Sequence, residues 1–339
     1  MNYSTTELLD GTRRLDPFMP FLLNLFCPGF VTFGTKEIAF DAWDEDFKLA
    51  PFVSPYVPGQ VSQQPGGELR KFIPPYLKPK DVVSPDRVLE RRPGEGFSGP
   101  LTPEERADAI RMDLLATHRK KIRRREEWML AQVLLTGQVV VSGPKYPEKL
   151  LDFRRDPNLT IDISGGAGAW NQTTAKPVED FQDWFELLEA PATHVFFGPG
   201  TLRAAFKDEE FKDLAETRRG SETRLEMAPA ELDASYAGRF RENGAELWEY
   251  KGWYKDAQGN KQYFIPYGHI VVASVAGASG VRTYGAILDA NAQYQEAEMW
   301  PKNWPDNDPG VEYIMTQSGP LPVLRRIDAT LCAKVLPTP

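Results

Sequence analysis

The sequence has few of the residues from which metal sites and disulfides are built. Among its 339 residues there are two cysteines, Cys27 and Cys332, and three histidines, His118, His194 and His269. The cysteines stand at opposite ends of the chain and form neither a metal-binding spacing nor a disulfide framework, which is typical of a protein made in a reducing cytoplasm. The histidines are widely spaced and match no metal motif, so we expect structural roles for them, with no bound metal and no cofactor.

Long apolar runs are also missing, and we expect no secretory leader. The longest apolar runs, such as 270–273, are far too short to span a membrane, and the first residues lack a basic start followed by an apolar core. The 40 basic and 48 acidic residues give a net charge of −8, which does not favour a dedicated DNA-binding protein. Because 41% of the residues are hydrophobic and 12% aromatic, the chain can build a real core.

The motifs of common enzyme classes are absent as well. The glycine-rich stretch 165–168 lacks the Gly-Lys-Ser/Thr ending of a phosphate loop, and in 142–145 Pro144 removes a needed N–H. No Gly-x-Ser-x-Gly elbow supplies a hydrolase nucleophile. The acidic clusters Asp44–Asp46 and Asp208–Glu210 are typical of solvated surface, although two carboxylates could in principle serve a glycosidase. We therefore expect no catalytic residues and no enzyme activity.

Proline, in contrast, is abundant. There are 29 prolines, and ten of them fall between residues 51 and 100. This density excludes regular helix there and disfavours central strands. The sequence predicts a long hairpin with one limb over 52–62, a turn over 63–67 and a return limb over 69–77.

The predicted hairpin carries apolar side chains that it cannot bury by itself. An isolated two-stranded hairpin is marginally stable in water, and the prolines bar it from a sheet interior. We expect it to lie across the long helix of an adjacent subunit, with interface residues Phe52, Val53, Tyr56, Phe72, Ile73, Tyr76 and Leu77. Four apolar residues of the preceding arm must also be buried, and a neighbouring subunit is one candidate for the covering surface; they are Leu22, Leu23, Leu25 and Phe26.

Residues 103–136 form the strongest predicted helix. Thr102-Pro103-Glu104-Glu105 is a capping box with proline at the first helical position, and Gly137 is a plausible stop. Thirty-four residues span about 50 Å, which suggests a spine for the fold. An apolar stripe runs along it, with a polar break near His118 and Arg125; its members are Ala107, Ile110, Leu114, Ile122, Met129 and Val133.

A basic run occupies the middle of this helix, with six basic residues among the seven of Arg119–Arg125. Such a run could neutralise DNA phosphates or pair with acids, either nearby or on another subunit. On one helix these charges point around most of the circumference. We therefore favour protein contacts over DNA contacts, with Arg119, Arg123 and Arg124 as subunit-interface candidates.

The remaining chain alternates short strands and helices. Patterning predicts strands at 138–142, 159–163, 194–197, 270–274, 312–315 and 331–335, helices at 181–188 and 201–217, and a hairpin of 248–254 with 263–265 around Gly259-Asn260. A short helix is expected at 5–9.

The order of these parts resembles the Hong Kong 97-like capsid fold. Local segments are similar to the lambda-type major capsid protein family, also called major capsid protein E; they are Val53-Ser54-Pro55, Phe72–Lys80, Arg282–Gly285, Asp289-Ala290, Pro301–Trp304 and Gln317–Leu321. The similarity runs from the N-terminus to about residue 335. The basic middle of the long helix is not typical of that family.

The resemblance implies an α+β fold with an N-terminal arm (1–50), an extended hairpin loop (51–100), a peripheral domain with the spine helix (101–176), an axial α/β domain (177–280) and returning peripheral strands with a tail (281–339). It implies a tailed-phage major capsid protein that forms hexamers and pentamers of an icosahedral head. Implied partners are copies of itself, portal and scaffold proteins, a decoration protein at three-fold positions, and enclosed double-stranded DNA held by weak contacts. The protein would assemble as a procapsid in the host cytoplasm and end in the virion.

Two other readings remain open. An acidic soluble hydrolase would be a compact monomer with a concave site. Another virion structural protein, such as a tail component, would also self-associate.

Overall fold

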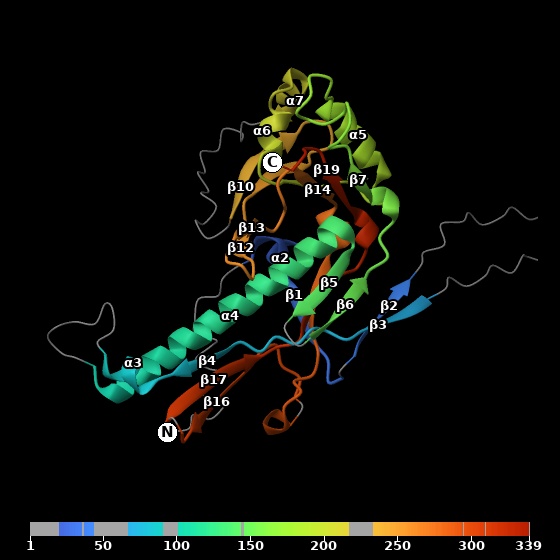
Figure 1. The fold of residues 1–339 in the computed structure, drawn as a ribbon. Helices are drawn as coiled ribbons and strands as arrows, with labels where there is room; N and C mark the ends of the chain where they lie inside the picture. Colours follow the sequence, from blue (N-terminus) through green and yellow to red (C-terminus); the bar gives the residue numbers. More distant parts are fainter. Residues whose placement is uncertain are drawn as a thin grey trace, which may run out of the picture.

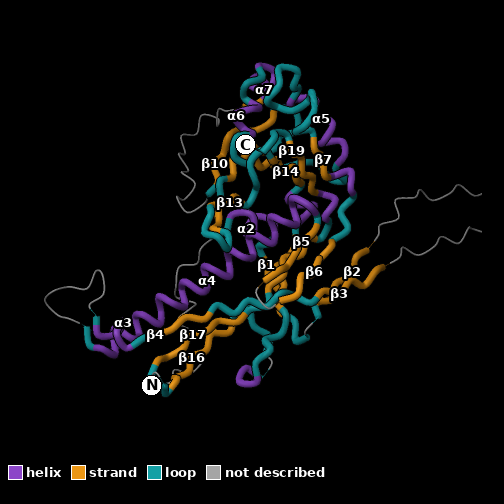
Figure 2. Tube along the Cα trace, in the orientation of Figure 1, coloured by secondary structure: helices purple, strands orange, loops and turns teal. Residues whose placement is uncertain are grey.

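The computed structural model describes residues 20–35, 37–43, 67–90, 101–143, 146–216, 233–293, 295–308 and 310–338 (Figure 1). The long helix α4 runs diagonally through the molecule and joins a sheet-and-helix body to an elongated lower part built mostly of strands (Figure 2). The mixed α+β class predicted from the sequence is confirmed.

Helix α4 has the predicted bounds, Pro103–Thr136. The Thr102 hydroxyl accepts a hydrogen bond from the Glu105 N–H, and the Glu105 carboxylate accepts one from the Thr102 N–H at 2.7 Å. At the other end Gly137 adopts a left-handed φ of 71°, and a Cβ there would lie 2.6 Å from Cβ of Arg155. The Arg155 guanidinium donates to the carbonyls of Leu134 and Leu135, so the last turn is capped by a side chain.

The capping box at Thr102 should stabilise the first turn of α4. We expect Thr102→Ala to cost about 1 kcal/mol of helix stability, because it leaves the first-turn N–H of Glu105 without its acceptor. Faster hydrogen exchange in residues 103–110 measures the loss. Thr117→Ala is the matched control, since Thr117 is an exposed mid-helix threonine that bonds only to the Asp113 carbonyl. Equal exchange in both variants would contradict the cap assignment.

Most residues of the predicted apolar stripe are buried. Ile110, Ile122, Met129 and Val133 are all at most 4% exposed, whereas Ala107 and Leu114 are half-buried. The predicted polar break at His118 is wrong, because His118 is fully buried. Its ring nitrogens lie 2.9 Å from the Asp81 carboxylate and 3.1 Å from the Thr316 hydroxyl, so the burial of this histidine is compensated by polar partners.

A seven-stranded sheet forms the upper body, in the order β7-β19-β14-β8-β11-β10-β9. Its strands are β7 (Thr160–Asp162), β8 (His194–Phe197), β9 (Ala215–Glu216), β10 (Ala234–Phe240), β11 (Glu246–Tyr250), β14 (His269–Ala273) and β19 (Thr330–Lys334). Strands β7, β8, β14 and β19 lie where the sequence predicts strands. The sheet therefore combines residues from the predicted peripheral domain, axial domain and tail.

Three helices cover this body: α5 (Pro177–Leu187), α6 (Thr201–Ala205) and α7 (Glu209–Leu214) (Figure 1). Phe181 of α5 stands at the centre of an aromatic core, with ring centroids 5.1–6.0 Å away in Trp184, Phe197, Phe211 and Phe240. The single helix predicted over 201–217 is wrong. Helix α6 ends at Ala205, Asp208 caps α7 by accepting from the Glu210 N–H, and β9 follows.

The predicted hairpin around Gly259 is shorter than expected. Strands β12 (Trp253–Lys255) and β13 (Lys261–Tyr263) pair across the turn. Trp248 and Tyr250 belong instead to β11, which pairs with β8 and β10 inside the main sheet.

The lower part consists of small sheets along α4. One contains β16 (Trp300–Asp306), β17 (Val311–Gln317) and β4 (Lys80–Val83); another contains β1 (Gly29–Thr32), β15 (Gly280–Tyr284) and β18 (Pro320–Leu324). Strand β5 (Gln138–Gly143) was predicted, but its partner β6 (Tyr146–Asp152) was not. Short helices are α3 (Pro85–Leu89) and α8 (Val275–Ala278), with 3-10 turns at Pro157–Leu159, Ala290–Ala292 and Ile327–Ala329.

The hairpin is paired differently from the prediction. Strand β2 (Ile38–Trp43) pairs with β3 (Gly67–Phe72), and the two form a ribbon that extends away from the body (Figure 1). The limb predicted over 52–62, with Phe52, Val53 and Tyr56, lies outside the described residues. The correct first strand was missed because it precedes the proline-rich segment.

The return limb packs on its own chain, contrary to the prediction. The Phe72 ring stacks on Phe153 at 5.4 Å, and the Tyr76 hydroxyl donates to the Ala286 carbonyl at 2.9 Å. Leu77 forms a β-bridge with Ser318. The prolines do exclude 73–76 from a strand, but an extended chain without ladder bonds can still be buried, as Pro74 and Pro75 are.

The arm is also covered by its own chain. Helix α2 (Phe21–Phe26) buries Leu22, Leu23 and Phe26 against α4 and the surrounding core, so these residues do not need a neighbouring subunit. The helix predicted at 5–9 lies outside the described residues. No helix in the described part of the chain is long and apolar enough to cross a bilayer.

Candidate assembly scaffold around the long helix

Arg123 of α4 is the centre of a buried ionic network. Its guanidinium donates to the Glu126 carboxylate at 2.7 Å, to the Tyr284 hydroxyl at 2.8 Å and to the Glu298 carboxylate. The side chains of Arg123 and Glu126 are 8% and 1% exposed. Burial raises the pKa of Glu126, and Arg123 opposes that shift. The network ties the middle of α4 to β15 and to the loop before β16.

Arg123 is therefore not available as a subunit-interface residue, and that part of the prediction is wrong. The sequence could not reveal this, because the rotation of the helix about its axis is fixed by tertiary packing.

Glu127, four residues after Arg123 on the same helix, joins three separate elements. Its carboxylate accepts hydrogen bonds from the N–H groups of Leu22 and Leu23, both at 2.9 Å, and from the Tyr250 hydroxyl at 2.7 Å. The side chain is completely buried, and burial raises its pKa to about 7. One carboxylate thus fixes the arm helix α2 and sheet strand β11 to α4.

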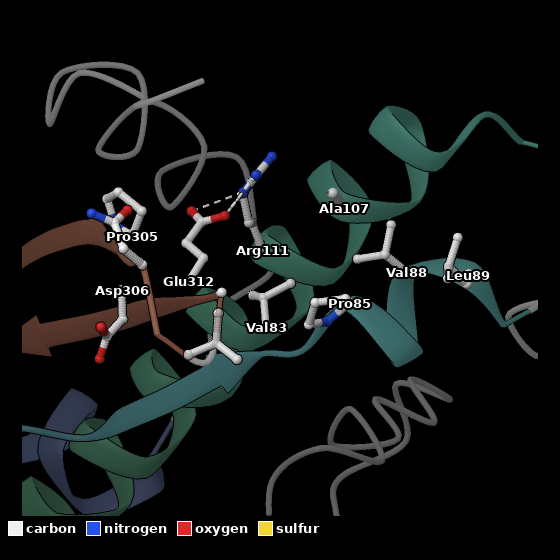
Figure 3. Close-up of a pocket in the computed structure, with 12 residues that line it drawn as sticks. Val83, Pro85, Val88, Leu89, Ala107, Arg111, Pro305, Asp306 and Glu312 are labelled. Atoms are coloured by element: carbon white, nitrogen blue, oxygen red, sulfur yellow. Dashed lines mark hydrogen bonds and ion pairs between the residues drawn. The ribbon is translucent and has the colours of Figure 1, made fainter.

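The N-terminal half of α4 is anchored to the lower sheet. Arg111 forms a bidentate pair with Glu312 of β17, with Nε and Nη2 lying 3.0 and 2.7 Å from Oε2. Figure 3 shows this pair at the wall of a hollow of about 490 Å³ whose floor is formed by Val83, Pro85 and Val88. Leu89, beside it, is 69% exposed. The hollow is largely apolar, and of the two acids that line it, Glu312 is paired with Arg111.

The basic run has a single exposed side, contrary to the prediction that it points around the helix. Ile122 and Arg123 face the interior, whereas Lys120, Lys121, Arg124 and Arg125 are exposed. Arg119 is half-buried. Because the inward residues break the run, the outward ones form one cationic face.

The described residues offer no arrangement typical of a catalytic or metal site. Among them, no three histidine, cysteine, aspartate or glutamate side chains are grouped to hold a metal ion. Asp208 and Glu210 belong to a surface helix start, and Lys212 pairs with Glu209. The Asp44–Asp46 cluster lies outside the described residues.

The architecture agrees with comparisons to known proteins. Residues 4–335 match the family model described as phage major capsid protein E. The chain belongs to this family. The major capsid protein of Escherichia phage lambda is 31% identical over 333 residues, covering 95% of this chain and 96% of that protein. The major capsid protein of Enterobacteria phage P21 is 30% identical over 340 residues, covering 98% and 99%.

Solved structures give the same result. A crystal structure described as the capsid protein of an Escherichia coli CFT073 prophage superposes with a TM-score of 0.78 at 25% identity, covering 99% of both chains. The SrpI encapsulin of Synechococcus elongatus shares the fold alone, with a TM-score of 0.50 at 10% identity. The family membership expected from the sequence is confirmed, and with it the role of a phage major capsid protein that forms a shell.

Sequence reasoning missed the most informative residues of this capsid protein, namely Glu126, Glu127 and Glu298. One signal was present: two consecutive acids stand immediately before the apolar segment Trp128–Leu130, at helical positions that must face the core. Buried carboxylates of this kind require donors. Those of Glu127 come from Leu22 and Tyr250, more than a hundred positions away, whereas Glu126 accepts from Arg123, three positions away.

Proposed function

We propose that this capsid protein assembles with copies of itself, as hexamers and pentamers, into an icosahedral head around double-stranded DNA. The observation that carries the proposal is the match over nearly the whole chain to capsid proteins of tailed phages. Its role is structural, without catalysis. Assembly takes place in the host cytoplasm, with a scaffold to set curvature, a portal as the DNA entry, and a decoration protein on the finished shell.

The ribbon of β2 and β3 is the proposed contact between subunits. It extends from the body, and an isolated two-stranded ribbon is marginally stable in water (Figure 1). The segment that joins the two strands carries Phe52, Val53 and Tyr56. Burying several large apolar side chains, at roughly 1.5–3 kcal/mol each, against a neighbouring copy would hold subunits firmly. Ile73, Tyr76 and Leu77, at the base of the ribbon, are half-buried on their own chain, so we do not count them in this contact.

Assembly of the purified full chain tests this proposal. We expect size-exclusion chromatography and negative-stain microscopy to show capsomers or shells for the natural sequence. Phe52→Asp should leave the circular dichroism spectrum and melting transition unchanged while abolishing closed shells, and Phe52→Leu, which keeps the apolar contact, should assemble. Phe72→Asp is unsuitable, because Phe72 stacks on Phe153 and its loss also weakens the fold.

Two results would contradict the proposal. A monodisperse monomer at all concentrations would overturn self-assembly. Normal shells from Phe52→Asp would overturn the ribbon contact while leaving the shell itself intact.

A further inference from the structure

A groove on the surface of the capsid protein is lined only by cationic and aromatic side chains. It encloses about 560 Å³ between helix α4 and strand β12. The lining residues are Lys121, Arg124, Arg125, Trp128, Trp253, Tyr254 and Lys255. Four of these seven are cations, three are aromatic, and none is acidic.

The helical wall of the groove follows from sequence spacing. Residues 121, 124, 125 and 128 stand at positions i, i+3, i+4 and i+7, so they share one face of α4. One contact joins the two walls, because Trp128 Nε1 donates to the Tyr254 hydroxyl at 3.2 Å. Within the helical wall, the Arg125 guanidinium lies 5.0 Å from the Trp128 ring centroid. The groove is therefore formed before any partner binds.

The charge of the groove remains positive after its neighbours are counted. Lys261 lies 5.0 Å from the Trp253 ring centroid and adds a fifth cation to the four that line the groove. Two acids of the described part of the chain interact with these cations: Asp81, whose carboxylate is 3.4 Å from Lys121 Nζ, and Asp233, which interacts with Arg124 and Lys261. The five cations outnumber these two described acids, on a chain whose net charge is −8.

We propose that this groove binds the sugar–phosphate backbone of DNA, with Trp253 and Tyr254 packing against a sugar ring of a duplex or an unpaired base of a single strand. Arginine and lysine neutralise phosphates without regard to sequence, and aromatic faces stack on any unpaired base. Trp253 is 39% exposed, so its ring is accessible for such stacking. An acidic peptide would use the cations but not the exposed aromatic ring. The inference rests on the proposed function, since a head protein meets DNA when the head is filled.

Fluorescence anisotropy with the unassembled full chain tests the proposal, using a labelled 20-base-pair duplex and a labelled 20-nucleotide single strand. We expect the affinity for the duplex to fall with salt, with a log–log slope of roughly −0.9 for each phosphate neutralised. The double variant Arg124→Gln/Lys255→Gln should reduce the slope by about 2, as expected for the loss of two phosphate contacts. Trp253→Ala should weaken single-strand binding about fivefold or more.

The control is Lys176→Gln/Lys212→Gln, which makes the same change in net charge at two exposed lysines near α5 and α7. It should leave the slope unchanged. Equal losses in both double variants would overturn the site in favour of general electrostatic attraction, as would unaltered binding by Trp253→Ala. Displacement of the DNA by a 20-residue polyglutamate at a lower concentration than by unlabelled duplex would overturn it in favour of an acidic protein partner. Shells that form while the subunit shows no DNA binding would refute this inference alone, not the proposed function.

Discussion

Replacing Arg123 with alanine should lower the free energy of unfolding by about 3–5 kcal/mol at pH 7, the range for removing one partner of a buried ion pair. The variant leaves the Glu126 carboxylate buried beside Glu298, without the guanidinium that both contact. It also removes the donor to the Tyr284 hydroxyl. Chemical denaturation followed by tryptophan fluorescence measures the loss.

Arg124→Ala is the matched control, because it removes the same side chain one position away on the exposed face of α4. Its effect on unfolding should lie within about 0.5 kcal/mol, as is usual at the surface. Part of the stability lost in Arg123→Ala should return at acidic pH, where Glu126 can be protonated. Equal stability of the two variants would contradict the buried network.

Stability should also depend on pH through Glu127, by up to about 3 kcal/mol. Burial raises the pKa of Glu127 from an ordinary 4.5 to about 7. Between these values the folded chain holds a proton that the unfolded chain has released, so the free energy of unfolding falls as pH rises from about 4.5 through 7. Above pH 7 both states are ionised, and this contribution no longer changes.

The comparison that isolates Glu127 is the natural chain against Glu127→Gln, measured by denaturation at several pH values from 5 to 8. Burial lowers the pKa of His118, His194 and His269, which gives the opposite trend in part of this window but is common to both chains. Tyr250, which also faces Glu127, has its pKa raised well above 10 and does not titrate here. Asp233 and Glu126 are present in both chains, so their titration does not contribute to the difference between them. The difference between the two chains should change by up to about 3 kcal/mol across the window; a constant difference would contradict the burial of an ionisable group at this position.

Local signals explain which elements the sequence could predict. Helix α4 was predicted to the residue, because a capping box, a first-turn proline and a terminal glycine are each encoded within a few positions. Strands β8, β14 and β19 are continuous apolar runs, which is typical of strands buried on both faces. Strand β6, Tyr146–Asp152, carries proline and charged residues and shows no such pattern, since it pairs only with β5.

Long-range packing explains what the sequence could not reveal. The pairing of β2 with β3 depends on a partner across more than twenty intervening residues. Arg123 and Arg124 are chemically equal in the sequence, and only the rotation of α4 against β15 separates a buried network residue from a groove residue. Likewise, α2 packs on its own chain, where the N–H groups of Leu22 and Leu23 donate to Glu127. This contact joins residues more than a hundred positions apart in the sequence.

Electron cryomicroscopy of particles made by the full chain tests most directly whether this protein closes a shell with copies of itself. We expect closed icosahedral particles whose wall consists of this chain, with the β2–β3 ribbon of each copy in contact with a neighbour. Open tubes of stacked rings, or a population of monomers with no particles under any assembly condition, would contradict it.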